Sequence, residues 1–166
     1  MIVVVAGVAG SGKTTVGSLL ARELGWTFAD GDGFHPAASK AKMHGGIPLS
    51  DADRWPWLRA IAAWMDERIA VGASAVVACS ALRREYRDLL LDGRPAAEMV
   101  FLVISREAGE ARLDHRRGHF FPEKLLASQY AALEPPAPDE RVAQVPAGDS
   151  AAATVARIIQ TLDLSR

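Results

Sequence analysis

The segment Gly7–Thr14 reads GVAGSGKT and has the spacing G-x-x-x-x-G-K-[ST]. It stands between the apolar run Ile2–Ala6 and a helical pattern that begins at Thr15, which is the order of strand, loop and helix that a phosphate-binding loop requires. Glycines in such a loop let successive backbone N–H groups turn inward around a polyphosphate. We expect Lys13 to reach the β and γ phosphates and the Thr14 hydroxyl to bind Mg²⁺. The sequence therefore predicts a site for a nucleoside triphosphate with Mg²⁺, formed by Gly7, Gly10, Ser11, Gly12, Lys13, Thr14 and Thr15.

Two aspartates follow the second predicted strand, in the sequence DGDGFHP at 30–36. Two carboxylates at a strand end can serve two tasks in phosphoryl transfer, because one can order the waters around Mg²⁺ while the other accepts the proton of an attacking hydroxyl. The predicted strands at 75–78 and 99–104 end without an acid, so we assign the metal-side task to Asp30 and the role of base to Asp32. The alternative interpretation is an Asx-type turn, in which both aspartates accept hydrogen bonds from backbone N–H groups.

An arginine stands near the beginning of the long helix that comes next. The residues at 50–53, SDAD, resemble a helix-capping sequence. Because proline is tolerated only near a helix start, the helix either bends at Pro56 or begins near Trp55. Both alternatives place Arg54 near the helix start, where its guanidinium could grip a polar substrate, although an isolated arginine is usually a solvated surface residue.

The sequence CSALRREYRD follows the third predicted strand and carries two arginines on one helix face. Cys79, at the end of a buried strand, is interpreted as a small packed residue rather than a nucleophile. Arg83 and Arg87 are four residues apart and therefore share a face. They could converge on an anionic substrate, or they could form an exposed face that is balanced by Glu85 and Asp88.

The densest basic cluster lies between two predicted helices and contains a glycine. Such a segment suits a mobile lid, at about 116–130, that closes over the transferring phosphate, excludes water and supplies positive charge. A histidine pair can also indicate zinc, but the single cysteine is far away in the sequence, so no ligand set has structural-zinc spacing. The cluster consists of Arg112, His115, Arg116, Arg117, Gly118, His119, Phe120 and Phe121.

The elements that must position these residues alternate between apolar strands and helical patterns. Strands are expected at 2–6, 26–29, 75–78, 99–104 and 141–145. Helices are expected at 15–24, 51–71, 83–91, 107–116, 123–133 and 151–162. Strands buried on both faces and separated by helices predict an α/β fold, a three-layer α/β/α sandwich with a five-stranded parallel sheet. Ligands bind such sheets at the carboxyl ends of the strands, where the aspartates stand.

The composition indicates one globular domain spanning 1–166. Hydrophobic residues make up 49% and charged residues 23%, which excludes a disordered or fibrous class. The net charge of −1 gives no reason to expect a nucleic-acid partner, and no apolar run approaches the roughly 20 residues that span a bilayer. The single cysteine, Cys79, cannot form an internal disulfide, which fits a reducing compartment. We therefore expect a cytoplasmic protein without a nucleic-acid or membrane partner.

Five motifs follow one another along most of the chain: GVAGSGKT at 7–14, DGDGFHP at 30–36, DRWPWL at 53–58, CSALRREYRD at 79–88, and RRGHFF with SQYAALEPP over 116–136. In this combination the sequence resembles the gluconate kinases, the small ATP-dependent gluconokinases of bacteria. Hundreds of families share the first motif, but the combination of the other four is specific. The resemblance implies a P-loop NTPase fold of the adenylate-kinase type, phosphorylation of D-gluconate by ATP to give 6-phosphogluconate and ADP, dependence on Mg²⁺, and a homodimer.

The resemblance also implies roles for individual residues. Lys13 and Arg116 would clamp the phosphates, and Asp30 would stay on the metal side. Thr14 stands where many relatives have serine, which retains the Mg²⁺ ligand, and Arg83 stands where lysine is frequent, which changes the donor geometry toward a carboxylate. The sugar acid would be held by Asp32, His35, Arg54, Arg83, Arg87 and His119.

Two other functions stay open at this point. A relative with the same scaffold could act on another small acid, such as shikimate, and a nucleotide-dependent regulatory switch could bind the nucleotide without transferring a phosphoryl group. The lid and the acidic pair argue against a switch, which needs neither. The adenine is expected near Arg112 and near 146–149, after the fifth strand.

Overall fold

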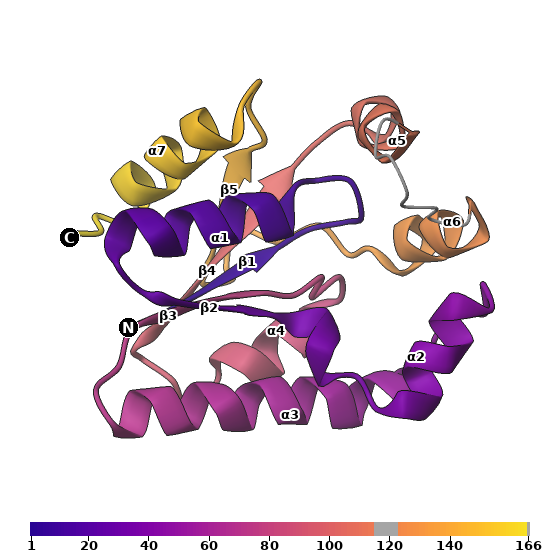
Figure 1. Cartoon of the computed structure of the whole chain (residues 1–166), viewed down its shortest axis with the longest axis horizontal. Coiled ribbons are helices and arrows are strands. Elements are labelled where there is room, and N and C mark those ends of the chain that lie inside the picture. Colours follow the sequence, from indigo (N-terminus) through magenta and orange to yellow (C-terminus); the bar gives the residue numbers. More distant parts are fainter. Residues whose placement is uncertain (115–122, 166) are drawn as a thin grey trace.

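The computed structural model describes residues 1–114 and 123–165, and strands alternate with helices along this part of the chain (Figure 1). Its strands are β1 (Ile2–Ala6), β2 (Thr27–Asp30), β3 (Ala75–Ala78), β4 (Ala97–Val103) and β5 (Val142–Pro146). Its helices are α1 (Lys13–Leu24), the 3₁₀ turn η1 (Gly31–Phe34), α2 (Ala37–His44), α3 (Asp51–Ala70), α4 (Arg84–Leu91), α5 (Arg106–Asp114), α6 (Glu123–Ala132) and α7 (Ala151–Thr161). None of the described helices combines the length and the apolar composition that crossing a bilayer requires.

The strands form one parallel sheet with the order β2-β3-β1-β4-β5. Helices α1 and α7 lie on one face of the sheet, and α3 and α4 lie on the other (Figure 1). This arrangement confirms the predicted α/β/α sandwich with a five-stranded parallel sheet. Because every strand pair is parallel, the loops that follow β1, β2 and β3 all start at the same edge of the sheet.

Strand β1 shows why both faces of the sheet need a helical layer. All of its residues are buried. Ile2, Val4 and Ala6 belong to the core under α3 and α4, whereas Val3 and Val5 belong to the core under α1 and α7. Successive side chains of a strand point to opposite faces, so an unbroken apolar run requires cover on both sides.

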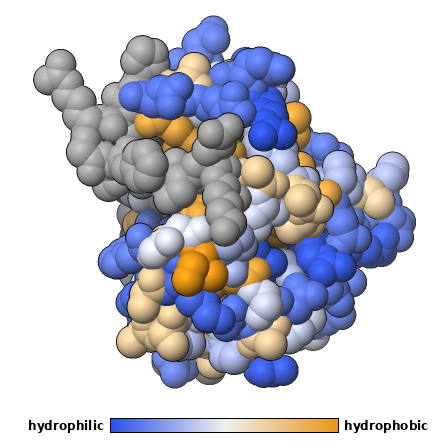
Figure 2. All heavy atoms as spheres, turned by 90° about the vertical axis from the view of Figure 1, so that its right-hand side faces the viewer, coloured by the Kyte–Doolittle hydropathy of each residue, from blue (hydrophilic) through white to orange (hydrophobic). Residues whose placement is uncertain are grey.

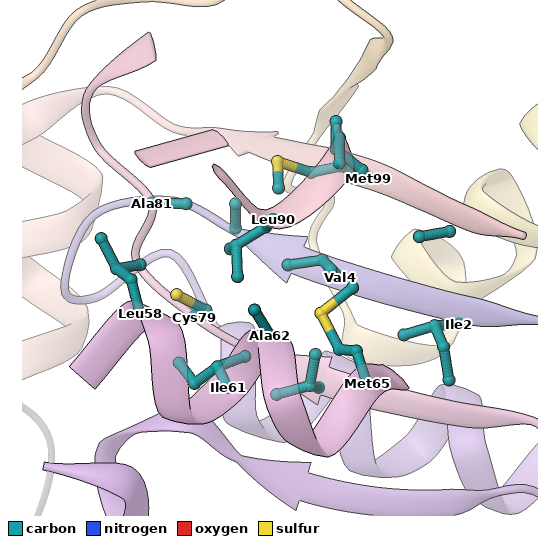
Figure 3. Close-up of a cluster of buried hydrophobic side chains, with 14 of the residues drawn as sticks. Ile2, Val4, Leu58, Ile61, Ala62, Met65, Cys79, Ala81, Leu90 and Met99 are labelled. Atoms are coloured by element: carbon teal, nitrogen blue, oxygen red, sulfur yellow. The ribbon is translucent and has the colours of Figure 1, made fainter. Parts of the chain in front are cut away.

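The core under α3 is shown in Figure 3, where apolar side chains of α3 lie against β1. Four of them recur at the i, i+3, i+4 and i+7 positions of an amphipathic helix, namely Leu58, Ile61, Ala62 and Met65. Cys79 lies in the same core, and its burial raises the pKa of its thiol to about 12. It is a packed residue, as the sequence indicates, and not a nucleophile.

The start of α3 resolves the two alternatives for Pro56. The Ser50 side chain accepts a hydrogen bond from the Asp53 N–H at 3.3 Å, and the Asp53 carboxylate accepts one from the Ser50 N–H at 2.9 Å, which completes a capping box. The helix begins at Asp51 and continues through Pro56, so it does not begin near Trp55. Pro56 lies close to the helix start, where its missing N–H removes one hydrogen bond of the helix.

The sequence pattern does not predict two of the observed elements, η1 and α2. Helix α2 reads AASKAKMH, and only Ser39 of these residues is buried, so it lacks the apolar stripe by which a helix is recognised. The turn η1 is capped by the Asp30 side chain. The other boundaries differ from the predicted ones by about one or two residues, as element ends commonly do.

Candidate active site

A cavity of about 650 Å³ lies at the carboxyl ends of β1, β2 and β3. Its walls come from the phosphate loop, from η1, from α2 and the segment that follows it, from the first turns of α3, and from α6. Figure 2 faces the side of the molecule on which α2 and α6 lie, and it shows mainly hydrophilic side chains with smaller apolar areas between them. The position of the cavity agrees with the expectation for a parallel sheet.

The phosphate loop joins β1 to α1. Gly10 and Gly12 have φ angles of +83° and +93°, which glycine adopts without strain. A Cβ atom at Gly10 would also lie 2.5 Å from the carbonyl oxygen of Gly109 in α5. Helix α1 begins without a side-chain cap, so its first N–H groups can bind an anion. The Lys13 Nζ, at the helix start, donates to the Val8 carbonyl oxygen at 3.1 Å.

Thr14 and Asp30 meet beside this loop. The Thr14 hydroxyl donates to Asp30 Oδ2 at 3.1 Å, and Asp30 Oδ1 accepts a hydrogen bond from the Asp32 N–H at 3.0 Å. Asp30 therefore caps the turn, as in the Asx alternative, and also faces the phosphate loop. Among the described residues, no group of three or more His, Cys, Asp or Glu side chains gathers around a metal position. Mg²⁺ fits the Thr14 and Asp30 oxygens, because it commonly takes one or two protein ligands and completes its shell with water and phosphate.

Asp32 lines the cavity one residue beyond the start of η1. The surrounding protein raises the pKa of its carboxyl by desolvation, the negative charge of Asp30 raises it further, and the positive charge of Lys13 lowers it. The residue is nevertheless exposed toward the cavity, so water reaches it until a ligand fills the space. A carboxylate with a raised pKa that faces an open cavity is suited to accept a proton from a hydroxyl.

His35 is buried in the cavity wall, with 6% of its surface exposed. Its ring stacks on Trp57 with 4.2 Å between centroids and an interplanar angle of 13°, and its Nδ1 has no hydrogen-bond partner among the described residues. Burial, together with the positive charges of Lys40 and Arg54, lowers the pKa of His35 to about 4. The imidazole is therefore neutral near pH 7, and it can bind hydroxyl groups but offers no positive charge to a carboxylate.

Arg54, in the first turns of α3, supplies positive charge to the cavity lining. Its side chain is 16% exposed, and Nη1 lies 3.4 Å from the Tyr86 hydroxyl and 4.0 Å from an Asp51 carboxylate oxygen. The Tyr86 hydroxyl in turn donates to Asp51. Among the described residues that line the cavity, only Lys13 and Arg54 are lysine or arginine. Lys13 stands at the phosphate loop, and Arg54 stands in the first turns of α3.

Arg83 stands outside the cavity lining in this structure. Its Nη1 donates to Asp51 Oδ2 at 2.9 Å, and its Nε donates to Glu134 Oε1 at 3.1 Å. The side chain is 36% exposed. Arg83 is thus joined through Asp51 to the pair of Arg54 and Tyr86, at the rim of the site and not within it.

Arg87 does not reach the cavity, contrary to the expectation that it faces a substrate. Its guanidinium is buried and bidentate to Glu140, with Nε to Oε1 at 2.7 Å and Nη2 to Oε2 at 3.2 Å, and Nη1 donates to the Ala81 carbonyl oxygen at 3.1 Å. A buried guanidinium can reach a ligand only by leaving the Glu140 charge uncompensated. Arg83, which is the N-cap residue of α4, and Arg87 thus both pair with acidic residues of the segment before β5, and Arg87 does not face the cavity.

A second cavity, of about 270 Å³, adjoins the other side of the phosphate loop. Arg112 of α5 crosses it, because Nη1 donates to the Ser11 carbonyl oxygen at 3.3 Å and Nη2 donates to the Gly148 carbonyl oxygen at 3.0 Å. The remaining lining comes from α1, from residues 148–150 and from the start of α7. The structure thus brings together the two regions that the sequence suggests for the adenine.

The predicted lid is only partly within the described residues. Arg116 and His119 lie outside them. Within α6, Leu125, Ser128 and Gln129 line the main cavity, and Gln129 Oε1 accepts a hydrogen bond from the Ala9 N–H of the phosphate loop at 2.7 Å.

Several residues of the cavity were given no role from the sequence. Three of them, Trp57, Tyr86 and Gln129, stand within the motifs DRWPWL, CSALRREYRD and SQYAALEPP. Their place in these motifs is the one feature of the sequence that could have indicated a role in the site. Met43 and His44 belong to α2, which the pattern does not predict, and no signal in the sequence indicates their position.

Comparisons with known proteins agree with the fold and with the family that the motifs indicate. A family model described as shikimate kinase matches residues 9–129. The gluconokinase of Gluconobacter oxydans is 48% identical over 142 residues, covering 86% of this chain and 80% of that relative. A crystal structure of a sugar kinase from Janibacter sp. HTCC2649 has a TM-score of 0.91 and 44% identity, covering 99% of this chain and 95% of the other. A crystal structure of a gluconokinase from Sinorhizobium meliloti 1021 has a TM-score of 0.81 and 42% identity, covering 97% and 94%.

Identity of this level over most of both chains confirms the resemblance that the motifs indicate. The parallel sheet, the glycine-rich loop before α1 and the acidic turn after β2 are all present in one structure. This chain belongs to the gluconokinase family of P-loop kinases.

Proposed function

We propose that this protein transfers the γ-phosphoryl group of ATP to the 6-hydroxyl of D-gluconate, which gives ADP and 6-phosphogluconate. One observation carries the proposal. A single cavity is lined both by the phosphate loop and by Asp32, His35 and Arg54. These are the groups that an acidic polyol needs, because its carboxylate requires a cation, its hydroxyl groups require neutral hydrogen-bond partners, and its reacting hydroxyl requires a base.

The phosphate loop and its neighbours act on the nucleotide in this proposal. The N–H groups at the start of α1 and the Lys13 ammonium bind the β and γ phosphates. Thr14 and Asp30 hold Mg²⁺, which when bound neutralises charge on the phosphates. Arg116 joins Lys13 at the γ-phosphoryl group, as the resemblance implies. The adenine occupies the cavity that Arg112 crosses, between α1 and the start of α7.

Asp32, Arg54 and His35 of the cavity lining act on the sugar acid in this proposal. Asp32 accepts the proton of the 6-hydroxyl while the oxygen attacks the γ-phosphorus in line with the leaving ADP oxygen. Arg54 binds the carboxylate, and Arg83 can join it at the rim after exchanging one of its acidic partners. His35 binds a hydroxyl of the chain as a neutral group, and His119 completes the acceptor site from the lid. We also propose that the protein is a cytoplasmic homodimer.

Shikimate is the alternative acceptor that an observation favours, because the matching family model is described as shikimate kinase. The relatives that match most of this chain at 42–48% identity are gluconokinases, which favours gluconate. A regulatory switch is not favoured, because an acceptor-binding wall with a base is of no use to a protein that only binds nucleotide.

The deciding experiment measures ADP release from Mg·ATP with no acceptor, with D-gluconate and with shikimate. Formation of 6-phosphogluconate is followed in parallel. The proposal predicts that D-gluconate alone stimulates ADP release strongly, and that Asp32→Asn abolishes most of this stimulation. Asp88→Asn, the same change at a half-exposed position of α4, serves as the control and should retain the wild-type rate. Stimulation by shikimate alone would identify shikimate, and not D-gluconate, as the acceptor. Stimulation by neither acid would contradict a kinase function for these compounds.

A further inference from the structure

Trp57 touches the turn after β2 at two points. Its indole Nε1 donates to the Gly31 carbonyl oxygen at 2.7 Å, and its ring stacks on His35 with 4.2 Å between centroids. The side chain is 3% exposed, yet it contributes to the lining of the main cavity. Figure 1 shows that this turn lies next to α3, the helix that carries Trp57.

The two residues that Trp57 contacts stand on either side of Asp32 in the sequence. Gly31 directly precedes Asp32, and His35 follows it three residues later, with its own N–H donating to the Asp32 carbonyl oxygen at 3.3 Å. Between these contacts the backbone makes the single 3₁₀ turn η1. A displacement of either end of this turn therefore moves the Asp32 carboxylate relative to the phosphate loop.

The other side of the turn is closed by the end of β3. A Cβ atom at Gly31 would lie 2.2 Å from the Ala78 carbonyl oxygen, so the backbone of the turn already touches that strand. Asp30 holds the Asp32 N–H from within the turn at 3.0 Å. With β3 on one side, the turn meets α3 on the other, where Trp57 donates a hydrogen bond to Gly31 and Trp64 packs edge-on against Phe34.

We propose that Trp57 is a positioning residue for phosphoryl transfer, which sets the place of Asp32 through its hydrogen bond to Gly31 and its stack on His35. The inference rests on the proposed function, in which Asp32 meets the acceptor hydroxyl. Trp57 need not touch the reacting atoms. It decides how closely the acceptor hydroxyl approaches the γ-phosphoryl group, and hence whether the hydroxyl or water receives that group.

Trp57→Phe tests this role, because phenylalanine retains an aromatic ring against His35 and removes the N–H that Gly31 binds. Misplacement of a reacting group by about 1 Å can cost on the order of a hundredfold in rate, so we expect kcat with D-gluconate to fall by about ten- to a hundredfold. The KM for ATP should stay within about twofold, because the phosphate loop is untouched. The ratio of ADP released to 6-phosphogluconate formed should rise, because water replaces a poorly placed hydroxyl.

Trp64→Phe is the matched control. Trp64 lies on the same helix, packs edge-on against Phe34 at 6.0 Å between centroids, and is not part of the cavity lining among the described residues. Its indole makes none of the hydrogen bonds found in the described chain, so the substitution should leave kcat and the product ratio at wild-type values. Both variants are assayed well below the melting temperature of each.

The outcomes separate the inference from the proposed function. The positioning role is supported if Trp57→Phe, but not Trp64→Phe, loses kcat and raises the ratio of ADP released to 6-phosphogluconate formed. Equal behaviour of the two variants, or a loss of kcat without a change of the ratio, would show a merely structural tryptophan and overturn it. If Trp57→Phe does not fold, Trp57→Tyr, which keeps the ring and places its donor elsewhere, is held to the same criteria. Absence of 6-phosphogluconate with the wild-type protein would instead refute the proposed function on which the inference rests.

Discussion

Replacing Arg87 with methionine separates a structural role of this residue from a substrate-binding one. The Arg87 and Glu140 side chains are 1% and 3% exposed, and two hydrogen bonds of 2.7 and 3.2 Å join them. Glu140 Oε2 also accepts the Ala137 N–H at 2.6 Å, and Arg87 donates to the Ala81 carbonyl oxygen at 3.1 Å. Every polar group of the pair is thus used inside the protein, and removal of the arginine leaves a buried carboxylate without its cation.

The size of the effect follows from this burial. Removing one partner of a buried ion pair costs about 3–5 kcal/mol. Since whole domains unfold with about 5–15 kcal/mol, Arg87→Met should lose a large part of the free energy of unfolding. The double variant Arg87→Met/Glu140→Leu removes both charges, and because apolar replacement of such pairs is often neutral or stabilising, it should recover most of the loss.

Urea denaturation followed by far-UV circular dichroism measures these free energies, and KM for D-gluconate is measured on the folded variants. Arg84→Met is the matched control, because Arg84 lies on the same helix as Arg87 and pairs with Asp139 at 2.7 Å. Both of these side chains are exposed, and an exposed pair contributes only about 0–1 kcal/mol. If Arg87→Met were as stable as the wild type and raised KM for D-gluconate about tenfold, Arg87 would belong to the substrate site and the reasoning from burial would be refuted.

Four further predictions concern the cavity. Asp32→Asn should lower kcat by about 10²- to 10⁴-fold, the contribution typical of a general base, with an unchanged melting temperature, and a variant that turns over at the wild-type rate would exclude Asp32 as the base. Lys13→Ala should abolish most turnover, and unaltered ATP kinetics would contradict the role of the phosphate loop. Arg54→Gln should raise KM for D-gluconate by roughly ten- to a hundredfold, because it removes a charge-assisted hydrogen bond of about 1.5–3 kcal/mol, while KM for ATP stays constant. The pKa of His35 is about 4 in the folded protein and 6.5 in the unfolded chain, so the unfolded state binds a proton first and stability should fall as the pH drops through this interval. At 1.36 kcal/mol per pH unit the loss is at most about 3.4 kcal/mol, and urea denaturation at several pH values should show a flatter profile for His35→Gln.

Predictions that depend on residues close together in the sequence agree with the structure. The capping box at the start of α3 joins Ser50 to Asp53, three residues away, and the strand, loop and helix order around the phosphate loop occupies one continuous segment. Asp30 and Asp32 stand two residues apart at the end of β2, where the order of apolar runs places them. Such features follow from backbone geometry over a few residues, so the spacing of residue types is enough to predict them.

The surroundings of the cavity depend on contacts between distant parts of the chain. Trp57 reaches Gly31 across 26 residues, Arg87 reaches Glu140 across 53, and Gln129 reaches Ala9 across 120. Nothing in the spacing of residues near Trp57 or Gln129 shows which backbone group each one binds. Arg116 and His119 lie outside the described residues, so their roles stay predictions.

The sequence by itself determined that this chain has a phosphate loop, an acidic turn after the next strand, and a parallel sheet to bring the two together, because periodicity and short motifs specify local backbone structure. Only the tertiary structure decided which arginine faces the cavity. The four-residue spacing predicts that Arg83 and Arg87 share a helix face, but that spacing is the same for an exposed face, a substrate-binding face and a buried one, and in the structure Arg83 only caps α4. The segment that carries Glu140 covers this face and pairs with Arg87. Burial is a property of the whole packed fold, and so it could be found only there.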